Sequence, residues 1–168
     1  MEHDRIECTI RPAEARDIPG VVALIRALAT FEKLAGPDDA AAARLASDFA
    51  RGDRFELLVA EDAADNARAL VGYALFFTTY STFLARPSLY LEDVFVLPER
   101  RGNGIGRLFL ERLAQLAVAR GCGRFEWTVL DWNVRAQDFY RSLGARILPE
   151  WQVCRVDGEA LQKLGEAK

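Results

Sequence analysis

The sequence is poor in the residues that bind metals or form disulfides: it has one histidine and three cysteines among 168 residues. The single histidine, His3, argues against a zinc site and a Ser-His-Asp triad, because both draw on imidazole groups held within the fold. Cys8, Cys122 and Cys154 are an odd number without Cys-x-x-Cys spacing, which favours a reduced protein over a disulfide framework. We therefore expect no metal site.

A basic surplus and a long apolar run are also missing. The net charge is −3, although arginine outnumbers lysine 19 to 3, whereas nucleic-acid binders usually carry excess positive charge to neutralise phosphates. No apolar run approaches the roughly 20 residues that cross a bilayer, and the polar first five residues predict no targeting segment. We expect a cytoplasmic protein that binds neither nucleic acid nor membrane.

The length and the pattern of apolar residues favour one domain over residues 1–168, with 51% hydrophobic residues to fill its core. Alternation and helical periodicity distinguish the expected elements. They predict strands at residues 6–11, 55–60, 69–78, 89–97, 124–130 and 151–156. They predict helices at 18–29, from Asp38 or Asp39 to about 51, at 104–120 and at 133–143, before a helical tail. Residues 80–88 are predicted as a loop, and Asp17 as the cap of the first helix. This order indicates an α/β domain with a mixed, mainly antiparallel sheet flanked by helices.

The strongest motif is Arg101-Gly102-Asn103-Gly104-Ile105-Gly106, between the strand at 89–97 and the following helix. Its glycines allow a tight turn and a close approach of the backbone to a ligand. The unpaired amides and the positive end of the helix dipole favour an anion such as a diphosphate, to which Arg100, Arg101 and Arg107 would add charge. The run lacks the Gly-Lys-Ser/Thr of a Walker loop and the context of a Rossmann fingerprint, and a plain structural turn is the alternative.

These residues resemble the R-x-x-G-x-G/A motif of the GNAT superfamily of acetyl-CoA-dependent N-acetyltransferases, with Arg101, Gly104 and Gly106 at its fixed positions. The similarity extends over nearly the whole chain. The segment Leu89-Tyr90-Leu91-Glu92-Asp93 is similar to the diamine (spermidine/spermine) acetyltransferase group. Phe31-Glu32-Lys33-Leu34 and Val129-Leu130-Asp131-Trp132-Asn133 are most similar to its thialysine N-epsilon-acetyltransferase branch.

The resemblance implies a GNAT fold whose two middle strands splay to admit pantetheine, and acetyl-CoA as cosubstrate. It also implies which residues bind the coenzyme: the backbone of Val94, Phe95 and Val96, the run Arg101, Gly102, Asn103, Gly104, Ile105, Gly106 and Arg107, and Asn133 and Tyr140. Asn133 is in addition the expected cap of the helix that follows it.

Two residues are candidates for the proton transfers. A primary ammonium has a pKa near 10.4, so less than about 0.1% is free amine at neutral pH, and an acceptor enzyme needs a base. By resemblance Glu92 removes this proton through water, and Tyr140 protonates the departing thiolate. From the residues alone, Glu92 and Asp93 also suit an ion pair or a solvent-facing position, and Tyr140 also suits a core position.

The acceptor is expected to be a small molecule with a primary amine. The resemblance places Phe31, Glu32, Glu92 and Asp93 in the acceptor pocket, with Glu150 as a further candidate, although Glu32 by itself also suits a solvated surface. Lys33 would repel a pure polycation but tolerates a zwitterionic amino acid, whose carboxylate Lys33 or Arg86 would bind. A thialysine-like amino acid is therefore the first expectation and a short diamine or polyamine the second.

Other functions remain open at this point. The domain could acetylate a protein N-terminus or a xenobiotic amine such as an aminoglycoside, or it could be a non-catalytic acyl-CoA sensor. The joint presence of Glu92 and Tyr140 argues against the sensor. The resemblance further implies a homodimer.

Overall fold

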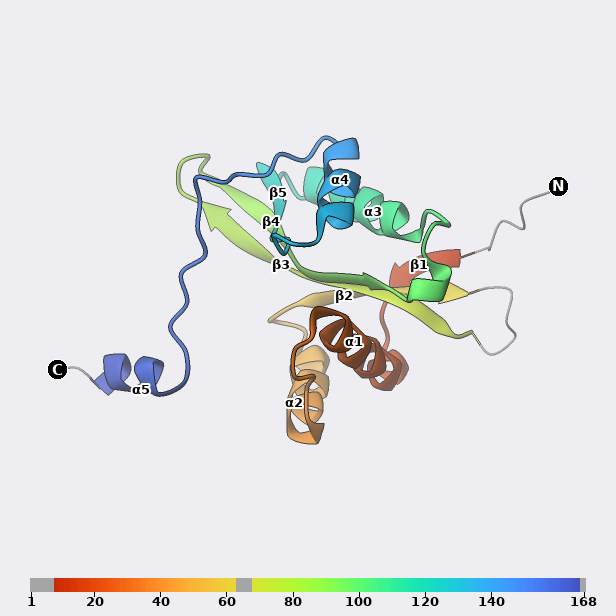
Figure 1. Ribbon diagram of the computed structural model, residues 1–168, viewed down its shortest axis with the longest axis horizontal. Helices are drawn as coiled ribbons and strands as arrows, with labels where there is room; N and C mark the ends of the chain where they lie inside the picture. Colours follow the sequence, from red (N-terminus) through yellow and green to blue (C-terminus); the bar gives the residue numbers. More distant parts are fainter. Residues whose placement is uncertain (1–7, 63–67, 167–168) are drawn as a thin grey trace. The chain divides into compact units, whose positions relative to one another are not determined.

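The computed structural model describes residues 8–62 and 68–166, and it is drawn in Figure 1. The chain divides after Thr128 into two compact units, Met1–Thr128 and Val129–Lys168, and each is described by itself. Ile6 and His3, which the sequence placed in or before the first strand, lie outside the described residues.

The first unit is built on a sheet of five strands in the order β1-β2-β3-β4-β5. The strands are β1 (Cys8–Pro12), β2 (Glu56–Asp62), β3 (Leu70–Ser81), β4 (Arg86–Val96) and β5 (Arg124–Trp127). All neighbouring pairs are antiparallel except β4 and β5, which are parallel. The predicted mixed, mainly antiparallel sheet is confirmed.

Helices cover both faces of this sheet, as Figure 1 shows. The helices α1 (Ile18–Glu32) and α2 (Asp39–Arg51) lie on one face, and α3 (Ile105–Ala119) lies on the other. Val21, Val59 and Tyr73 are fully buried in the core under α1, while Phe109 and Leu113 of α3 are fully buried on the opposite face. The predicted α/β class with flanking helices is therefore confirmed, and every helix predicted in this unit forms.

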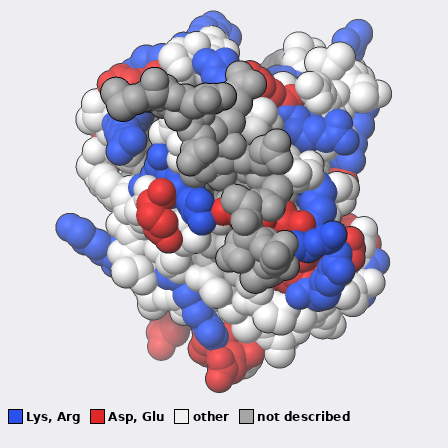
Figure 2. Space-filling model, turned by 90° about the vertical axis from the view of Figure 1, so that its right-hand side faces the viewer, with Lys and Arg blue, Asp and Glu red and all other residues white. Residues whose placement is uncertain are grey.

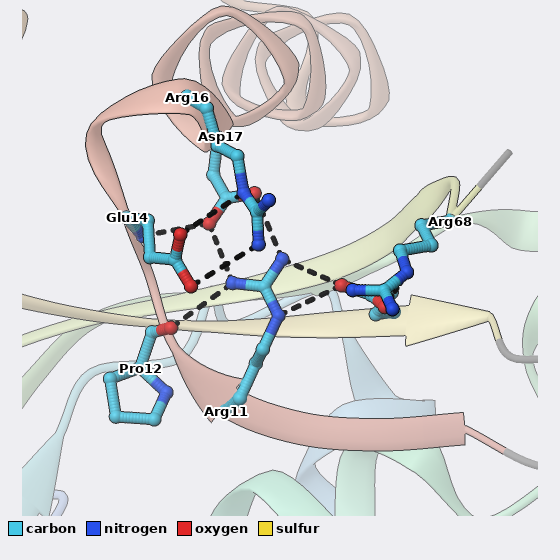
Figure 3. Close-up of polar contacts among 7 residues, drawn as sticks. Arg11, Pro12, Glu14, Arg16, Asp17 and Arg68 are labelled. Carbon is cyan, nitrogen blue, oxygen red and sulfur yellow. Dashed lines mark hydrogen bonds and ion pairs between the residues drawn. The ribbon is translucent and has the colours of Figure 1, made fainter.

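Asp17 does not cap α1 through its side chain, contrary to the prediction. A 3-10 turn, η1 (Ala15–Asp17), precedes the helix, and the Asp17 carboxylate is drawn to Arg11 at 2.7 Å and to the amide of Glu14 at 2.7 Å. Arg11 also reaches Glu61 on β2 (Figure 3). The Asp17 carboxylate forms charge-assisted hydrogen bonds to Arg11, which are stronger than a bond to an amide of α1 would be. These bonds fix the start of α1 against β1 and β2.

The predicted loop over residues 80–88 is wrong, because β3 and β4 continue into a longer hairpin. Tyr80 pairs with Pro87 and Ser81 with Arg86, which leaves only residues 82–85 in the turn. Pro87 is tolerated in β4 because its carbonyl is used, accepting a hydrogen bond from the Gly123 amide at 2.8 Å, while it has no amide to leave unpaired. The hairpin thus forms where local composition indicated a break.

The second unit contains α4 (Val134–Ser142) and α5 (Gly158–Glu166). Asn133 caps α4 as predicted, its side chain accepting from the Ala136 amide at 3.2 Å. The predicted strand at residues 151–156 is wrong: this segment has no regular secondary structure, and β5 ends at Trp127 rather than at residue 130. A strand needs a partner for its backbone groups, and alternation alone does not supply one.

The three cysteines are free thiols, and burial raises the pKa of Cys8 above its ordinary value. The described helices include none with the length and apolar character needed to cross a membrane. In the part of the chain that the structure describes, no cluster of three histidine, cysteine or acidic side chains could hold a metal ion. Acidic and basic side chains are interspersed over the face drawn in Figure 2.

Candidate active site

The site begins where β5 stops pairing with β4. The two strands pair in parallel from Ser88 to Leu91, opposite Arg124 to Trp127, and the pairing ends there. β4 continues to Val96, paired on its other side with β3. Residues 92–96 therefore have an open edge, on which no strand of the described residues pairs. This opening lies between β4 and β5, and β5 is the last strand of the described sheet, so the splayed pair is not in its middle as expected.

The backbone groups on this open edge belong to Val94 and Val96. The Leu97 amide donates to the Val71 carbonyl at 2.9 Å, so residue 97 points its backbone toward β3. In an antiparallel pair the direction alternates along the strand, which directs residues 94 and 96 away from β3 and residue 95 toward it. Val94 thus offers its amide and carbonyl to an extended ligand, and Val96 offers its amide, because Arg101 Nε already donates to the Val96 carbonyl at 2.9 Å. Phe95 contributes its side chain to the core, where it is 4% exposed.

Glu92 and Asp93, here called the acid pair, lie at a bulge in β4. Tyr90 pairs with Phe77 and Asp93 with Leu75, both of which pack in the core under α1, and the register shifts between these pairs. Simple alternation would put residues 90 and 93 on opposite faces. The extra residue at the bulge resets the alternation, so Asp93 faces the α1 side. Glu92 lies close enough to Asp93 and Tyr73 to raise the pKa of both.

Asp93 is the more buried member of this pair. The Tyr73 hydroxyl on β3, itself fully buried, donates to Asp93 Oδ2 at 3.2 Å. Burial, the neighbouring Glu92 carboxylate and, less strongly, Glu32 raise the pKa of Asp93 to about 6, against the hydrogen bond from Tyr73, which lowers it. Burial likewise raises the pKa of Tyr73, which keeps its proton and remains a donor. Glu92 is exposed.

The end of α1 completes this acidic face. Phe31 and Glu32 are its last two residues, and Lys33 ends it in the left-handed region at φ 59°. Phe31 is 38% exposed and Glu32 is half-buried. The structure therefore brings the predicted Phe31, Glu32, Glu92 and Asp93 together, and their carboxylates form a local field that suits a cation.

The glycine-rich loop lies between β4 and α3. Gly102 and Gly104 have φ of 85° and 82°, which side chains rarely adopt, and each has open space where a Cβ would project. Gly104 is the N-cap of α3 without a side-chain cap, and Ile105 and Gly106 begin the helix. The first helical amides have no intrahelical partner. This exposed backbone at a helix N-terminus fits the predicted anion site.

Asn103 and two of the neighbouring arginines are engaged within the fold. The Asn103 side chain donates to the Arg100 carbonyl at 3.2 Å. Arg100 forms an ion pair with the buried Asp62 at 2.7 Å, and Arg107 forms one with Glu111 at 3.3 Å. The ion pair with Asp62 anchors the glycine-rich loop to β2, so Arg100 has a structural role in the loop.

Arg101 folds back toward the sheet. Its Nε donates to the Val96 carbonyl at 2.9 Å. Its guanidinium lies over the rings of Phe31 and Phe95, with its central carbon 4.9 Å and 5.3 Å from their centroids. The sequence assigned Arg101 to charge near a diphosphate; the structure shows a packing role between α1 and β4.

The remaining predicted residues belong to the second unit. Tyr140 is half-buried on α4, one turn of helix beyond Ala136, and burial raises its pKa above the ordinary value. Its ring lies against Phe139, with centroids 5.5 Å apart. Glu150 lies in an exposed turn.

Sequence reasoning missed Tyr73 and the Arg101 contacts. Tyr73 lies in the apolar strand Leu70–Ser81 and reads as a core residue. The hydrogen bond from Tyr73 to Asp93 depends on the β3–β4 register and on the bulge, and no local pattern specified either.

Comparison with known proteins gives a consistent result. The model of the acetyltransferase (GNAT) family matches residues 22–145. Thialysine N-epsilon-acetyltransferase from Sus scrofa is 39% identical over 163 residues, covering 92% of this chain and 95% of the relative. L-ornithine N5-acetyltransferase from Arabidopsis thaliana is 44% identical over 99 residues, covering 59% of this chain and 43% of the relative. A solved aminoglycoside N-acetyltransferase in complex with CoA has a TM-score of 0.74 at 18% identity, covering 89% of this chain and 95% of that one, which shows a shared fold.

Proposed function

The chain belongs to the acetyltransferase (GNAT) family and is an acetyl-CoA-dependent N-acetyltransferase, and we propose that its acceptor is the side-chain amine of a small amino acid. The observation that carries the proposal is the set of three neighbouring carboxylates, Glu32, Glu92 and Asp93, beside the open edge of β4. The relatives from Sus scrofa and Arabidopsis thaliana are named for amino acids that bear such an amine. A short diamine or polyamine is the second candidate acceptor.

The coenzyme is proposed to bind along β4 and at the start of α3. Val94 and Val96 would pair with the pantetheine amides as an added strand. The amides of residues 102–107 would hold the diphosphate, since Gly102 and Gly104 leave the backbone uncovered. Asn133, Tyr140 and Arg107 complete the coenzyme contacts in this proposal, and Arg101 contributes by holding the loop to β4.

The acidic face prepares the nucleophile. An ammonium group is attracted by the carboxylates, and Glu92, which is exposed, accepts its proton directly or through water. Asp93, held by Tyr73, keeps a negative charge beside it at neutral pH because its pKa of about 6 lies below that pH. The free amine then attacks the thioester carbonyl in a ternary complex, with the backbone amide of Val96 polarising that carbonyl.

Tyr140 is proposed to protonate the departing thiolate. A thiol has a pKa near 8.5 and a phenol one near 10, so the transfer is close in energy. Burial raises the pKa of Tyr140 further, so the hydroxyl carries its proton at neutral pH and is a weaker acid than a free phenol. No covalent intermediate on the protein is required.

Lys33 favours an amino acid over a simple diamine. It follows Glu32 directly and is exposed, so it can bind a carboxylate near the acidic face. Arg86, the other candidate, begins β4 six residues before Glu92, a distance of roughly 20 Å along a strand. A small amino acid does not reach that far.

The test is thiol release from acetyl-CoA with a panel of amines: thialysine, ornithine, putrescine, spermidine, an aminoglycoside and a peptide with a free N-terminus. We expect kcat/KM to be highest for thialysine or ornithine and lower for putrescine. Glu92→Gln should lose most of this activity, while Asp48→Asn, an equal charge change at a half-buried residue of α2 that is ion-paired with Arg54, should retain it. Highest activity with the peptide or the aminoglycoside would refute the acceptor class. CoA binding without turnover of any amine would indicate a sensor.

A further inference from the structure

Arg101 contacts the two sides of the site at once. Its backbone begins the glycine-rich loop, its Nε donates to the Val96 carbonyl, and its guanidinium lies between Phe31 of α1 and Phe95 of β4. Phe31 precedes Glu32, which is close enough to Asp93 to raise its pKa. A single side chain thus connects the loop of the coenzyme site with the helix end of the acceptor site.

The Val96 carbonyl that Arg101 holds lies on the open edge of β4. The Leu97 amide of the same peptide unit donates toward β3, to the Val71 carbonyl at 2.9 Å. Because a trans peptide directs its carbonyl opposite to its amide, the Val96 oxygen points to the side where β5 no longer pairs. The bond from Arg101 therefore anchors its side chain to the edge along which an extended ligand would lie.

The rings hold the guanidinium plane in place. Phe95 is 4% exposed and fixed in the core, whereas Phe31 is 38% exposed and ends its helix. A planar guanidinium stacks on two rings and still donates from Nε, which a lysine ammonium cannot do. Movement of the loop at Arg101 should therefore disturb its contact with Phe31.

We propose that Arg101 is a positioning residue that couples occupancy of the coenzyme loop to the affinity for the amine, by holding Phe31 and the end of α1 against β4. This proposal rests on the proposed function for the identity of the acceptor. Coupling between two binding sites is reciprocal, so the amine must also strengthen coenzyme binding. The pair Arg101–Phe31 carries this coupling.

The experiment is a double-mutant cycle with Arg101→Lys, Phe31→Leu and the double variant. At saturating acetyl-CoA, each single variant should raise the KM for the amine about five- to twentyfold and change kcat by less than about threefold. The KM of the double variant should lie within about twofold of the KM of the more impaired single variant, since both substitutions break the same contact. Phe31→Tyr, which keeps the ring, should restore the KM.

A matched control removes a ring elsewhere on the same face. Phe49→Leu takes away the α2 ring that packs on Phe55, and it should leave the KM for the amine unchanged. Thermal unfolding of each variant verifies that it is folded. If Arg101→Lys does not fold, Phe31→Leu against Phe31→Tyr provides the same comparison.

The CoA affinity of the wild type and of the same three variants is also measured by calorimetry, which needs no acceptor amine. Phe31→Leu should weaken CoA binding about threefold or more, although only Arg101 of the pair lies in the loop. The coupling would be overturned if the two single effects on the KM for the amine multiplied in the double variant. It would also be overturned if Arg101→Lys changed the CoA affinity and left the KM for the amine unchanged. A wild-type protein that turns over no amine would refute the proposed function instead, and the CoA cycle would still decide the role of Arg101.

Discussion

Asp93 and Tyr73 set the charge of the acidic face at the scale of single residues. Burial and two neighbouring carboxylates favour the protonated form of Asp93, and the Tyr73 hydroxyl favours the ionised form. The balance leaves its pKa at about 6, close enough to neutrality to titrate in an ordinary assay. The pH dependence of kcat/KM should therefore reflect the ionisation of Asp93.

We predict that kcat/KM for the amine falls as the pH drops below about 6, because Asp93 then loses its negative charge. Glu32→Gln removes a neighbouring like charge that raises the pKa of Asp93, and it should move this fall in kcat/KM to lower pH. Tyr73→Phe removes the hydrogen bond to the carboxylate and should move the fall to higher pH. Steady-state kinetics from pH 5 to 8.5 measures these shifts.

The control for this series is Tyr80→Phe, which removes an exposed hydroxyl at the far end of β3. It should leave the fall in kcat/KM at the pH where the wild type has it. If the fall in kcat/KM stays at the same pH in Glu32→Gln and Tyr73→Phe, it belongs to a group other than Asp93.

Tyr140→Phe should lower kcat at least about tenfold and change CoA affinity little, because general-acid catalysis contributes roughly 10²–10⁴ in rate. Single-turnover kinetics and CoA calorimetry separate the two effects. Tyr90→Phe, which alters a half-buried tyrosine of β4, is the control. Unchanged turnover in Tyr140→Phe would show that water or another group protonates the sulfur.

The glycine-rich loop acts at the scale of the element, since its use depends on the backbone path between β4 and α3. Gly102 and Gly104 hold left-handed conformations with open space around them. The capping glycines were predictable, because glycine is the residue that adopts this conformation without strain. The tethering of the loop by Arg100 and Asp62 was not, because the two residues are far apart in the sequence.

Gly104→Ala should destabilise the fold by about 1 kcal/mol, the cost of a left-handed residue with a Cβ, and should weaken CoA binding more than about tenfold. Gly52→Ala is matched to it: Gly52 has φ of 70°, is equally uncrowded and ends α2. It should show a similar loss of stability by urea unfolding and no loss of CoA affinity. Equal CoA affinity in the two variants would place the diphosphate elsewhere.

At the scale of the whole molecule, the Arg11 network ties together parts of the first unit that are distant in sequence. Arg11 on β1 holds Asp17 before α1 and Glu61 on β2 (Figure 3). Asp17 is 6% exposed, and the hydrogen bonds from Arg11 hold its pKa below the ordinary value. The loss of one partner would leave a buried charge uncompensated.

Arg11→Met should lower the free energy of unfolding at pH 7 by roughly 2–4 kcal/mol, measured by urea denaturation. The folded-state pKa of Asp17 is depressed, so its contribution is complete above the unfolded pKa of about 3.9 and is lost as the pH falls through the lower folded value. The difference between wild type and variant should therefore shrink below about pH 4. Arg16→Met, which breaks an exposed pair with Glu14, should change stability by less than about 0.5 kcal/mol. A loss in Arg11→Met that is independent of pH would assign it to packing.

The homodimer implied by the family resemblance stays a prediction. Light scattering should give a mass of twice 18.8 kDa for the full chain. A mass of 18.8 kDa at micromolar concentration would contradict it.

The sequence by itself determined the helices of the first unit, the mainly antiparallel sheet, the glycine bend before α3 and the cap of α4, because these follow from local periodicity and backbone preference. It also named Glu92 and Asp93, but it left their directions open. Only the tertiary structure decided that a bulge directs Asp93 to the α1 face, that Tyr73 holds its carboxylate, and that Arg101 packs against Phe31 and Phe95. Register and long-range pairing are settled by the packing of the entire sheet, and no short stretch of sequence contains that information.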